Sequence, residues 1–103
     1  MVVSLKDNEF EAKTKKGSVI IDFYADWCGP CKMMSPIFEK VAGETKDVSF
    51  FKLDVDSNPE SADKAGVRSI PTLLFLKDGE EVDRITGVLP EPAFKEKVSS
   101  AFK

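Results

Sequence analysis

This chain of 103 residues contains no histidine and only two cysteines, Cys28 and Cys31. A closed structural zinc site needs about four ligands, most often from these two residue types, so the sequence argues against such a site. The chain also lacks any apolar run that approaches the roughly 18 residues needed to cross a bilayer. Internal repeats, low-complexity tracts and a nucleotide-binding glycine motif are missing as well.

A strong excess of charge of either sign is also lacking. The chain has 15 Lys and Arg against 18 Asp and Glu, and its net charge of −3 gives no electrostatic reason to expect binding to nucleic acid or to an anionic membrane. Residues 1–7 contain no apolar signal-peptide core, so we expect a cytoplasmic protein. With 42% hydrophobic and 32% charged residues, the composition and length predict one globular domain over residues 1–103.

The apolar pattern predicts nine secondary-structure elements in the order βαβαβαββα. The expected strands cover residues 2–5, 19–24, 48–55, 72–77 and 81–86. The first three helices are expected after residue 7, at the cysteines and after residue 58, and the last helix places Phe94, Val98, Ala101 and Phe102 on one face. Asp7 is expected to cap the first helix and Asn58 the third, and Pro36 to kink the second helix without ending it. Asp78 and Gly79 predict a tight hairpin. Parallel crossover units followed by an antiparallel hairpin predict an α/β fold, with a mixed five-stranded sheet and four helices on its two faces.

Both cysteines lie in the segment WCGPCK, residues 27–32, between the strand pattern at 19–24 and the second helix. Two cysteines at this spacing can form and reopen a disulfide across one helical turn. We expect the Cys28 sulfur to be exposed at the helix N-terminus, where free N–H groups and the helix dipole favour a thiolate. Cys31, one turn further, is expected to be buried. A purely structural disulfide is the alternative, but so short a loop would constrain the unfolded chain little.

Asp22 is unusual because it lies in the middle of a strand that is predicted to be buried. Burial disfavours the ionised carboxylate, so we expect the pKa of Asp22 to be raised. Lys52, within an otherwise apolar part of the neighbouring strand pattern, is the expected electrostatic partner of Asp22.

Taken together, these residues resemble the thioredoxin family. The matching positions follow the family's order and spacing over almost the whole chain: residues 19–24, 25–32, 36, 52–56, 69–72, 78–79 and 87. The CGPC segment is a good signal of the family by itself. Combined with Ile-Pro-Thr some forty residues later, it makes the probability of a chance resemblance very small. Two features depart from the family pattern. Tyr24 occupies a position that more often carries tryptophan, and Val88 with Pro90 and Pro92 makes the last connection atypical.

The resemblance implies a thioredoxin fold and a general protein-disulfide reductase, as in a small single-domain CGPC member of the family. Cys28 would attack a substrate disulfide, and Cys31 would resolve the mixed disulfide. Thioredoxins are themselves a standard example of a cysteine whose ionisation is favoured in a CxxC motif. Asp22 would accept the proton of Cys31, with Lys52 as its electrostatic partner. The alternative is that Asp22 and Lys52 form only a structural pair.

The resemblance also implies roles for residues around the cysteines. Gly29 and Pro30 would tune the redox poise of the cysteine pair, and Gly-Pro is typical of the reducing members of the superfamily. The alternative is that Pro30 is an ordinary proline in the first turn of a helix. Pro71 would be cis, would lie against the sulfurs and would deny a metal its approach. Substrate would be bound in a shallow groove formed by Trp27, Ile70, Thr72, Gly87 and Val88. For Trp27 the alternative is packing in the core.

No cofactor is expected beyond a redox-active Cys28–Cys31 disulfide. The implied partners are a flavin- and NADPH-dependent thioredoxin reductase and diverse client proteins with disulfides, and the chain is expected to act as a monomer. Two other functions stay open: a non-catalytic binding module with incidental cysteines, and a disulfide oxidase or isomerase. The Gly-Pro dipeptide and the lack of an export signal argue against the oxidase or isomerase.

Overall fold

The computed structural model describes residues 1–103 and contains one five-stranded mixed sheet. Its strands are β1 (Val2–Ser4), β2 (Ser18–Tyr24), β3 (Val48–Asp54), β4 (Thr72–Lys77) and β5 (Glu80–Thr86). Its helices are α1 (Phe10–Thr14), preceded by the 3₁₀ turn η1 (Asp7–Glu9), then α2 (Gly29–Glu44), α3 (Pro59–Ala65) and α4 (Glu91–Ala101). The predicted order βαβαβαββα and the α/β fold class are therefore confirmed.

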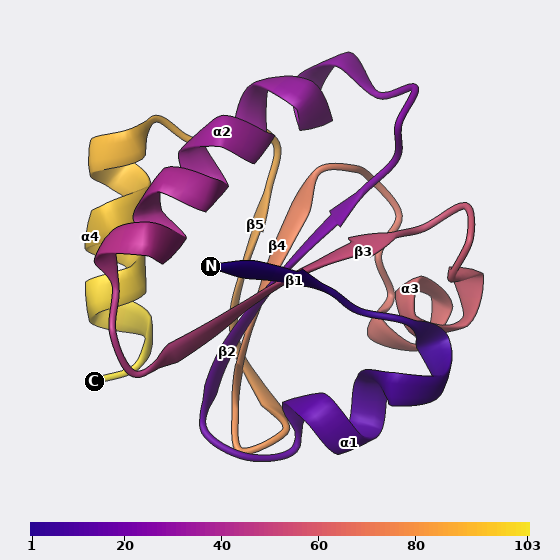
Figure 1. Cartoon of the computed structure of the whole chain (residues 1–103), viewed down its shortest axis with the longest axis horizontal. Coiled ribbons are helices and arrows are strands. Elements are labelled where there is room, and N and C mark those ends of the chain that lie inside the picture. Colours follow the sequence, from indigo (N-terminus) through magenta and orange to yellow (C-terminus); the bar gives the residue numbers. More distant parts are fainter.

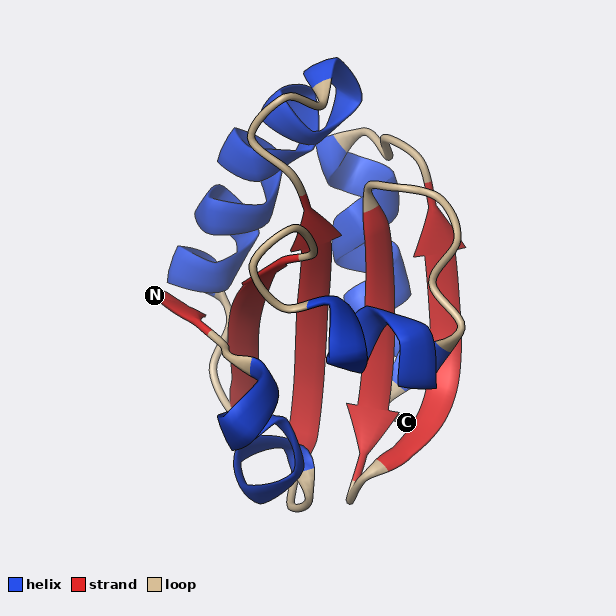
Figure 2. Cartoon of the chain, turned by 90° about the vertical axis from the view of Figure 1, so that its right-hand side faces the viewer, coloured by secondary structure: helices blue, strands red, loops and turns tan.

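The strands lie in the order β1-β3-β2-β4-β5. β1 and β2 run parallel to β3, whereas β4 is antiparallel to β2 and β5 is antiparallel to β4. Figure 1 shows α2 and α4 on one side of the sheet and α1 and α3 on the other, and Figure 2 views the sheet from the side of α1 and α3. The predicted parallel front half and closing antiparallel hairpin are both present.

Each face of the sheet carries an apolar core, because successive side chains of a strand point to opposite faces. On the side of α2 and α4, the core contains Ile20 and Phe75, and the rings of Phe38 and Phe94 stack there with centroids 5.8 Å apart. The core on the side of α1 and α3 includes Val19, Ile21, Phe23, Leu53, Leu74 and Leu76. β2 is buried on both faces, as its nearly continuous apolar run predicts.

The local turn signals are confirmed. Asp78 and Gly79 both have positive φ and join β4 to β5 in a tight hairpin. Gly66 adopts the left-handed conformation immediately after α3. Pro36 lies inside α2, and the helix continues past it to Glu44.

Asp7 and Asn58 both cap a helix, but neither caps the helix that was predicted for it. The Asp7 carboxylate accepts hydrogen bonds from the Glu60 N–H (3.2 Å), the Ser61 N–H (2.8 Å) and the Ser61 hydroxyl (2.6 Å), so it caps α3 instead of its own helix. Asn58 precedes α3 but makes no side-chain cap bond there, and its Oδ1 accepts from the Asp7 N–H at 3.0 Å. Each residue thus binds the start of the other's helical segment, although the two are 51 positions apart in the sequence. Local patterns do not reveal such a contact.

Replacing Asp7 with alanine is expected to lower the free energy of unfolding by about 1–2 kcal/mol, because the Glu60 and Ser61 N–H groups lose their acceptor. Burial alone would raise the pKa of Asp7, but the bonds from Ser61 and Glu60 hold it below its usual value. Urea denaturation at neutral pH measures the effect. Asp7→Asn keeps an acceptor oxygen and serves as the control with a smaller loss. An unchanged denaturation midpoint for Asp7→Ala would contradict the capping role.

Candidate active site

The strand directions bring three separate segments to one edge of the sheet. Phe23 of β2 pairs with Thr72 of β4, and Thr72 pairs in turn with Thr86 of β5. Because β4 runs antiparallel to both neighbours, its beginning lies beside the ends of β2 and β5. The cysteine segment after β2, the Ile70-Pro71 peptide before β4 and the loop after β5 therefore leave the sheet at the same edge.

Cys28 and Cys31 form a disulfide at the N-terminus of α2. Cys28 is the N-cap residue and Gly29 begins the helix, with Pro30 in the first turn, where its missing N–H would have had no helical partner. The Cα atoms of the two cysteines are 5.2 Å apart, and the Cys31 N–H donates to the Cys28 Sγ at 3.2 Å. The first-turn N–H groups and the positive end of the helix dipole thus favour negative charge on the Cys28 sulfur.

The expectation that Cys28 is exposed is wrong for this disulfide form. The exposed fraction of Cys28 is 4%, and that of Cys31 is 2%. The two cysteines form a small buried cluster with Ala25, and the half-buried side chains of Tyr24, Val55 and Ile70 pack against it. Two of these neighbours, Val55 and Ile70, come from segments far from the cysteines in the sequence, so the local pattern around Cys28 does not reveal its burial. The predicted burial of Cys31 is confirmed.

The Ile70-Pro71 peptide bond is cis, and the carbonyl oxygen of Ile70 lies 3.9 Å from the Cys28 Sγ. Pro71 is buried, and its carbonyl accepts a hydrogen bond from the Gly87 N–H at 2.8 Å. Gly87 has φ of +96°, a conformation that disfavours residues with a Cβ. Ile70 therefore lies beside the sulfur, and Gly87 is held to the same loop through Pro71.

Thr72 does not reach the surface of this region. Its exposed fraction is 2%, and its hydroxyl donates to the Ser69 carbonyl at 2.6 Å. The side chain of Thr72 therefore offers no exposed surface, and it holds the end of the preceding loop from inside. The reason is that β4 starts at Thr72 and points this side chain away from solvent.

Trp27 and Val88 are exposed at this edge, with exposed fractions of 70% and 37%. The alternative that Trp27 packs in the core is therefore wrong. Its indole Nε1 donates to Asp56 Oδ2 at 2.7 Å, which anchors the ring to the segment that follows β3. The sequence pattern gives no sign that Asp56 belongs to the site. Only the parallel pairing of β2 with β3, whose ends meet at this edge, brings the two residues together.

Asp22 lies on the α2 side of the sheet, because it follows Ile20 by two positions in β2. It is 3% exposed, and its Oδ1 has no hydrogen-bond partner. Burial raises the pKa of Asp22 from 3.8 to about 7, and the charge of Lys52 opposes part of that rise. The predicted burial of Asp22, which is the cause of the raised pKa, is thereby confirmed. A carboxyl group with this pKa can release or accept a proton near neutral pH.

Lys52 is the neighbour of Asp22 in the parallel pairing of β2 with β3. It is half-buried, and the two side chains form no ion pair within 4.0 Å. The structure therefore does not contain the alternative, a structural ion pair between Asp22 and Lys52. Lys52 acts on Asp22 as a nearby charge.

No group of three or more His, Cys, Asp or Glu side chains is arranged to hold a metal ion. None of the helices has the length and apolar character required to span a membrane.

Comparisons with known proteins agree with the geometry. The family model described as Thioredoxin matches residues 1–100. Thioredoxin from Bacillus subtilis (strain 168) is 48% identical over 99 residues, which cover 95% of this chain and 95% of that protein. Thioredoxin from Staphylococcus epidermidis is 46% identical over 91 residues, covering 87% and 88%. Among solved structures, a mutant thioredoxin from Halobacterium salinarum NRC-1 has a TM-score of 0.89 and 38% identity, covering 99% of this chain and 91% of that one.

Proposed function

The chain belongs to the thioredoxin family of thiol-disulfide oxidoreductases, and we propose that it is a general protein-disulfide reductase in which Cys28 attacks and Cys31 resolves. The observation that carries this proposal is the Cys28–Cys31 disulfide at the N-terminus of α2, with the Cys31 N–H directed at the Cys28 sulfur. The helix terminus favours a thiolate on Cys28 once the disulfide is reduced.

In the reductive reaction, the Cys28 thiolate attacks one sulfur of a client disulfide. The client S–S bond breaks, its other sulfur leaves as a thiolate and takes up a proton, and a Cys28–client mixed disulfide forms. Cys31 then loses its proton and attacks the Cys28 sulfur, which releases the second client sulfur as a thiol. The client has gained two electrons and two protons, and the Cys28–Cys31 disulfide has formed.

We assign Asp22 to the proton transfer in the second step. Its buried carboxyl lies on the α2 side of the sheet and has a pKa of about 7. In the ionised form it accepts the proton of Cys31, directly or through water, and Lys52 favours that ionised form. Gly29 and Pro30 are assigned the tuning of the redox poise, by resemblance to the family.

The client would bind in a groove whose rim is formed by Trp27, Ile70, Gly87 and Val88. These residues surround the cysteine segment at one edge of the sheet, and Trp27 and Val88 expose apolar surface there. Such a surface suits transient contact with extended, flexible segments of many proteins. Pro71 and Thr72 would shape the groove from below.

The oxidised protein has to be reduced again after each cycle. We propose that a flavin-dependent thioredoxin reductase supplies the electrons from NADPH, and that no bound cofactor is needed beyond the disulfide. The protein would act as a monomer of one domain. We place this activity in the cytoplasm, where thiols are kept reduced and oxidised client pairs need a reductase.

The test is the reduction of insulin disulfides, driven by thioredoxin reductase and NADPH. We expect turnover with the unaltered chain and none when both cysteines are replaced with serine. A binding module with incidental cysteines would keep its biological activity in the double variant. The reduction potential separates a reductase from an oxidase or isomerase, since about 30 mV shifts this equilibrium tenfold. An unaltered chain that does not reduce insulin would contradict the proposed function.

A further inference from the structure

β5 contains a bulge that places two opposite charges on one face of the strand. Asp83 pairs with Phe75 of β4, but the next pair is Leu76 with Glu81, so Val82 is an extra residue. In a regular strand, residues three apart point to opposite faces. The extra residue brings Glu81 onto the same face as Arg84, and there both lie on the α3 side of the sheet.

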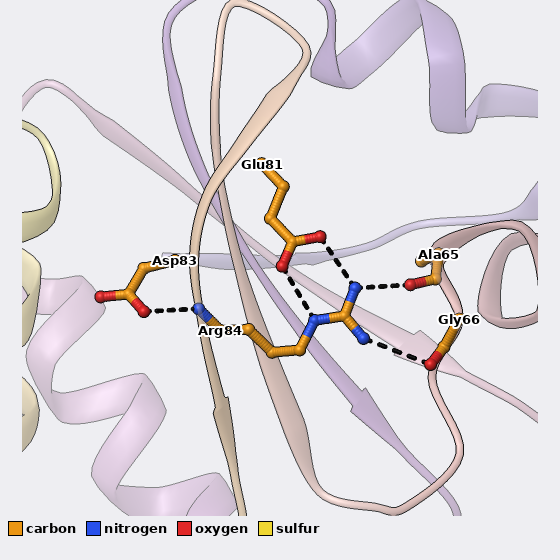
Figure 3. Close-up of polar contacts among 5 residues, drawn as sticks. All are labelled: Ala65, Gly66, Glu81, Asp83 and Arg84. Carbon is orange, nitrogen blue, oxygen red and sulfur yellow. Dashed lines mark hydrogen bonds and ion pairs between the residues drawn. The ribbon is translucent and has the colours of Figure 1, made fainter.

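The guanidinium group of Arg84 binds the C-terminal end of α3. Glu81 accepts from it through two oxygens, at 2.9 and 2.8 Å, which orients its plane. Two further N–H groups donate to the main-chain carbonyls of Ala65 and, at 3.2 Å, of Gly66 (Figure 3). These carbonyls lie at the helix end, where no helical N–H is available to them and a positive charge is favoured. A simple surface ion pair would not need the two carbonyls.

The same helix end leads directly into the site. Gly66 ends α3, and the Val67 N–H returns to the Ala62 carbonyl at 2.9 Å. Three residues later, the carbonyl of Ile70 lies 3.9 Å from the Cys28 sulfur. Arg84 therefore joins β5 to the start of the loop whose end forms one side of the proposed groove.

We propose that Arg84 is a positioning residue that holds the α3–β4 loop for binding extended segments of client proteins. This inference rests on the proposed reductase function and adds a determinant of specificity to it. When the loop is held in place, the backbone of Ile70 can bind the peptide that flanks the disulfide of a client protein. A small disulfide without flanking peptide does not use the loop. Arg84 thus favours protein disulfides over small ones.

Arginine is suited to this role because its planar group donates to a carboxylate and to two carbonyls simultaneously. Lysine at position 84 would provide the charge but only a single donating nitrogen, so it should hold the α3–β4 loop only in part.

The experiment compares second-order rate constants of the reduced protein with insulin disulfides and with 2-hydroxyethyl disulfide. In Arg84→Gln, we expect the rate constant with insulin, divided by the rate constant with 2-hydroxyethyl disulfide, to fall about threefold to tenfold. This range corresponds to the loss of one or two hydrogen bonds. Arg84→Lys should give an intermediate ratio. Amide hydrogen exchange over residues 67–70 should be faster in Arg84→Gln than in the unaltered chain.

Lys97→Gln is the matched control. It removes another ion pair of β5, between Lys97 and Asp83 at 2.9 Å, which joins the strand to α4 and not to the α3–β4 loop. Its rate ratio should stay at the unaltered value. An unchanged ratio in Arg84→Gln, or an equal fall in Lys97→Gln, would overturn the positioning role. An unaltered chain without insulin reductase activity would instead overturn the proposed function, and the exchange measurement would then still decide whether Arg84 holds the loop.

Discussion

Replacing Cys28 with serine is expected to reduce the rate of insulin-disulfide reduction by roughly 10³-fold or more, as removal of a nucleophile does in other enzymes. A serine hydroxyl is not ionised near neutral pH and does not form a disulfide with a client. The helix terminus that favours a thiolate at residue 28 then has no sulfur to act on. The measurement is the NADPH-coupled insulin assay with equal amounts of folded protein.

Cys31→Ser is the matched variant, because it removes the other member of the same pair. It is also expected to lose turnover, but for a different reason: the attack by Cys28 still occurs, and the mixed disulfide is not resolved. Non-reducing electrophoresis with an oxidised client should therefore show a covalent adduct for Cys31→Ser and almost none for Cys28→Ser. The opposite pattern would mean that the two roles are reversed.

Replacing Asp22 with asparagine is expected to raise the free energy of unfolding by about 4 kcal/mol at roughly pH 8. The pKa of this carboxyl is raised by burial from 3.8 to about 7. The folded state therefore holds the proton more tightly than the unfolded state. Stability is lost as the pH rises through this interval, and the loss is complete above the folded pKa. Below about pH 3 the side chain is neutral in both states, so the gain from the substitution should vanish there.

Chemical denaturation of the reduced and oxidised protein across this pH range measures the effect. Asparagine is nearly isosteric, so it removes the charge without a cavity, whereas Asp22→Ala adds the loss of packing and should stabilise less. Both variants should also reduce insulin more slowly, since the proton acceptor for Cys31 is gone. A variant that is clearly less stable at about pH 8 would show that Asp22 is chiefly a structural partner of its surroundings.

Much of the fold was predictable because its signals are local. The apolar run that became β2 predicts a central strand, since a strand covered on both faces has no room for polar alternation. Asp78 and Gly79 predict the hairpin because few other residue pairs adopt its backbone angles without strain. The position of Cys28 before a helix follows from the same kind of pattern.

The parts that were missed depend on contacts between distant segments or on an irregularity in strand pairing. Asp7 looks like a cap for its own helix, yet its carboxylate binds the start of α3. Trp27 gives no sign of its bond to Asp56, and the pairing of Glu81 with Arg84 depends on a bulge at Val82. A bulge changes which face every later side chain of the strand occupies, and it leaves no clear mark in residue types.

The sequence by itself determined the order of the elements, the CxxC pair at a helix start and the raised pKa of a carboxyl group in a buried strand. These follow from backbone preferences, from the period of the apolar residues and from the cost of burying charge. The tertiary structure alone decided that Cys28 is covered and that Thr72 points inward. It also decided that Asp22 and Lys52 do not form an ion pair within 4.0 Å, and that Arg84 binds the end of α3. The cover over a particular side chain and its hydrogen-bond partners come from several packed segments together, and no single segment contains that information.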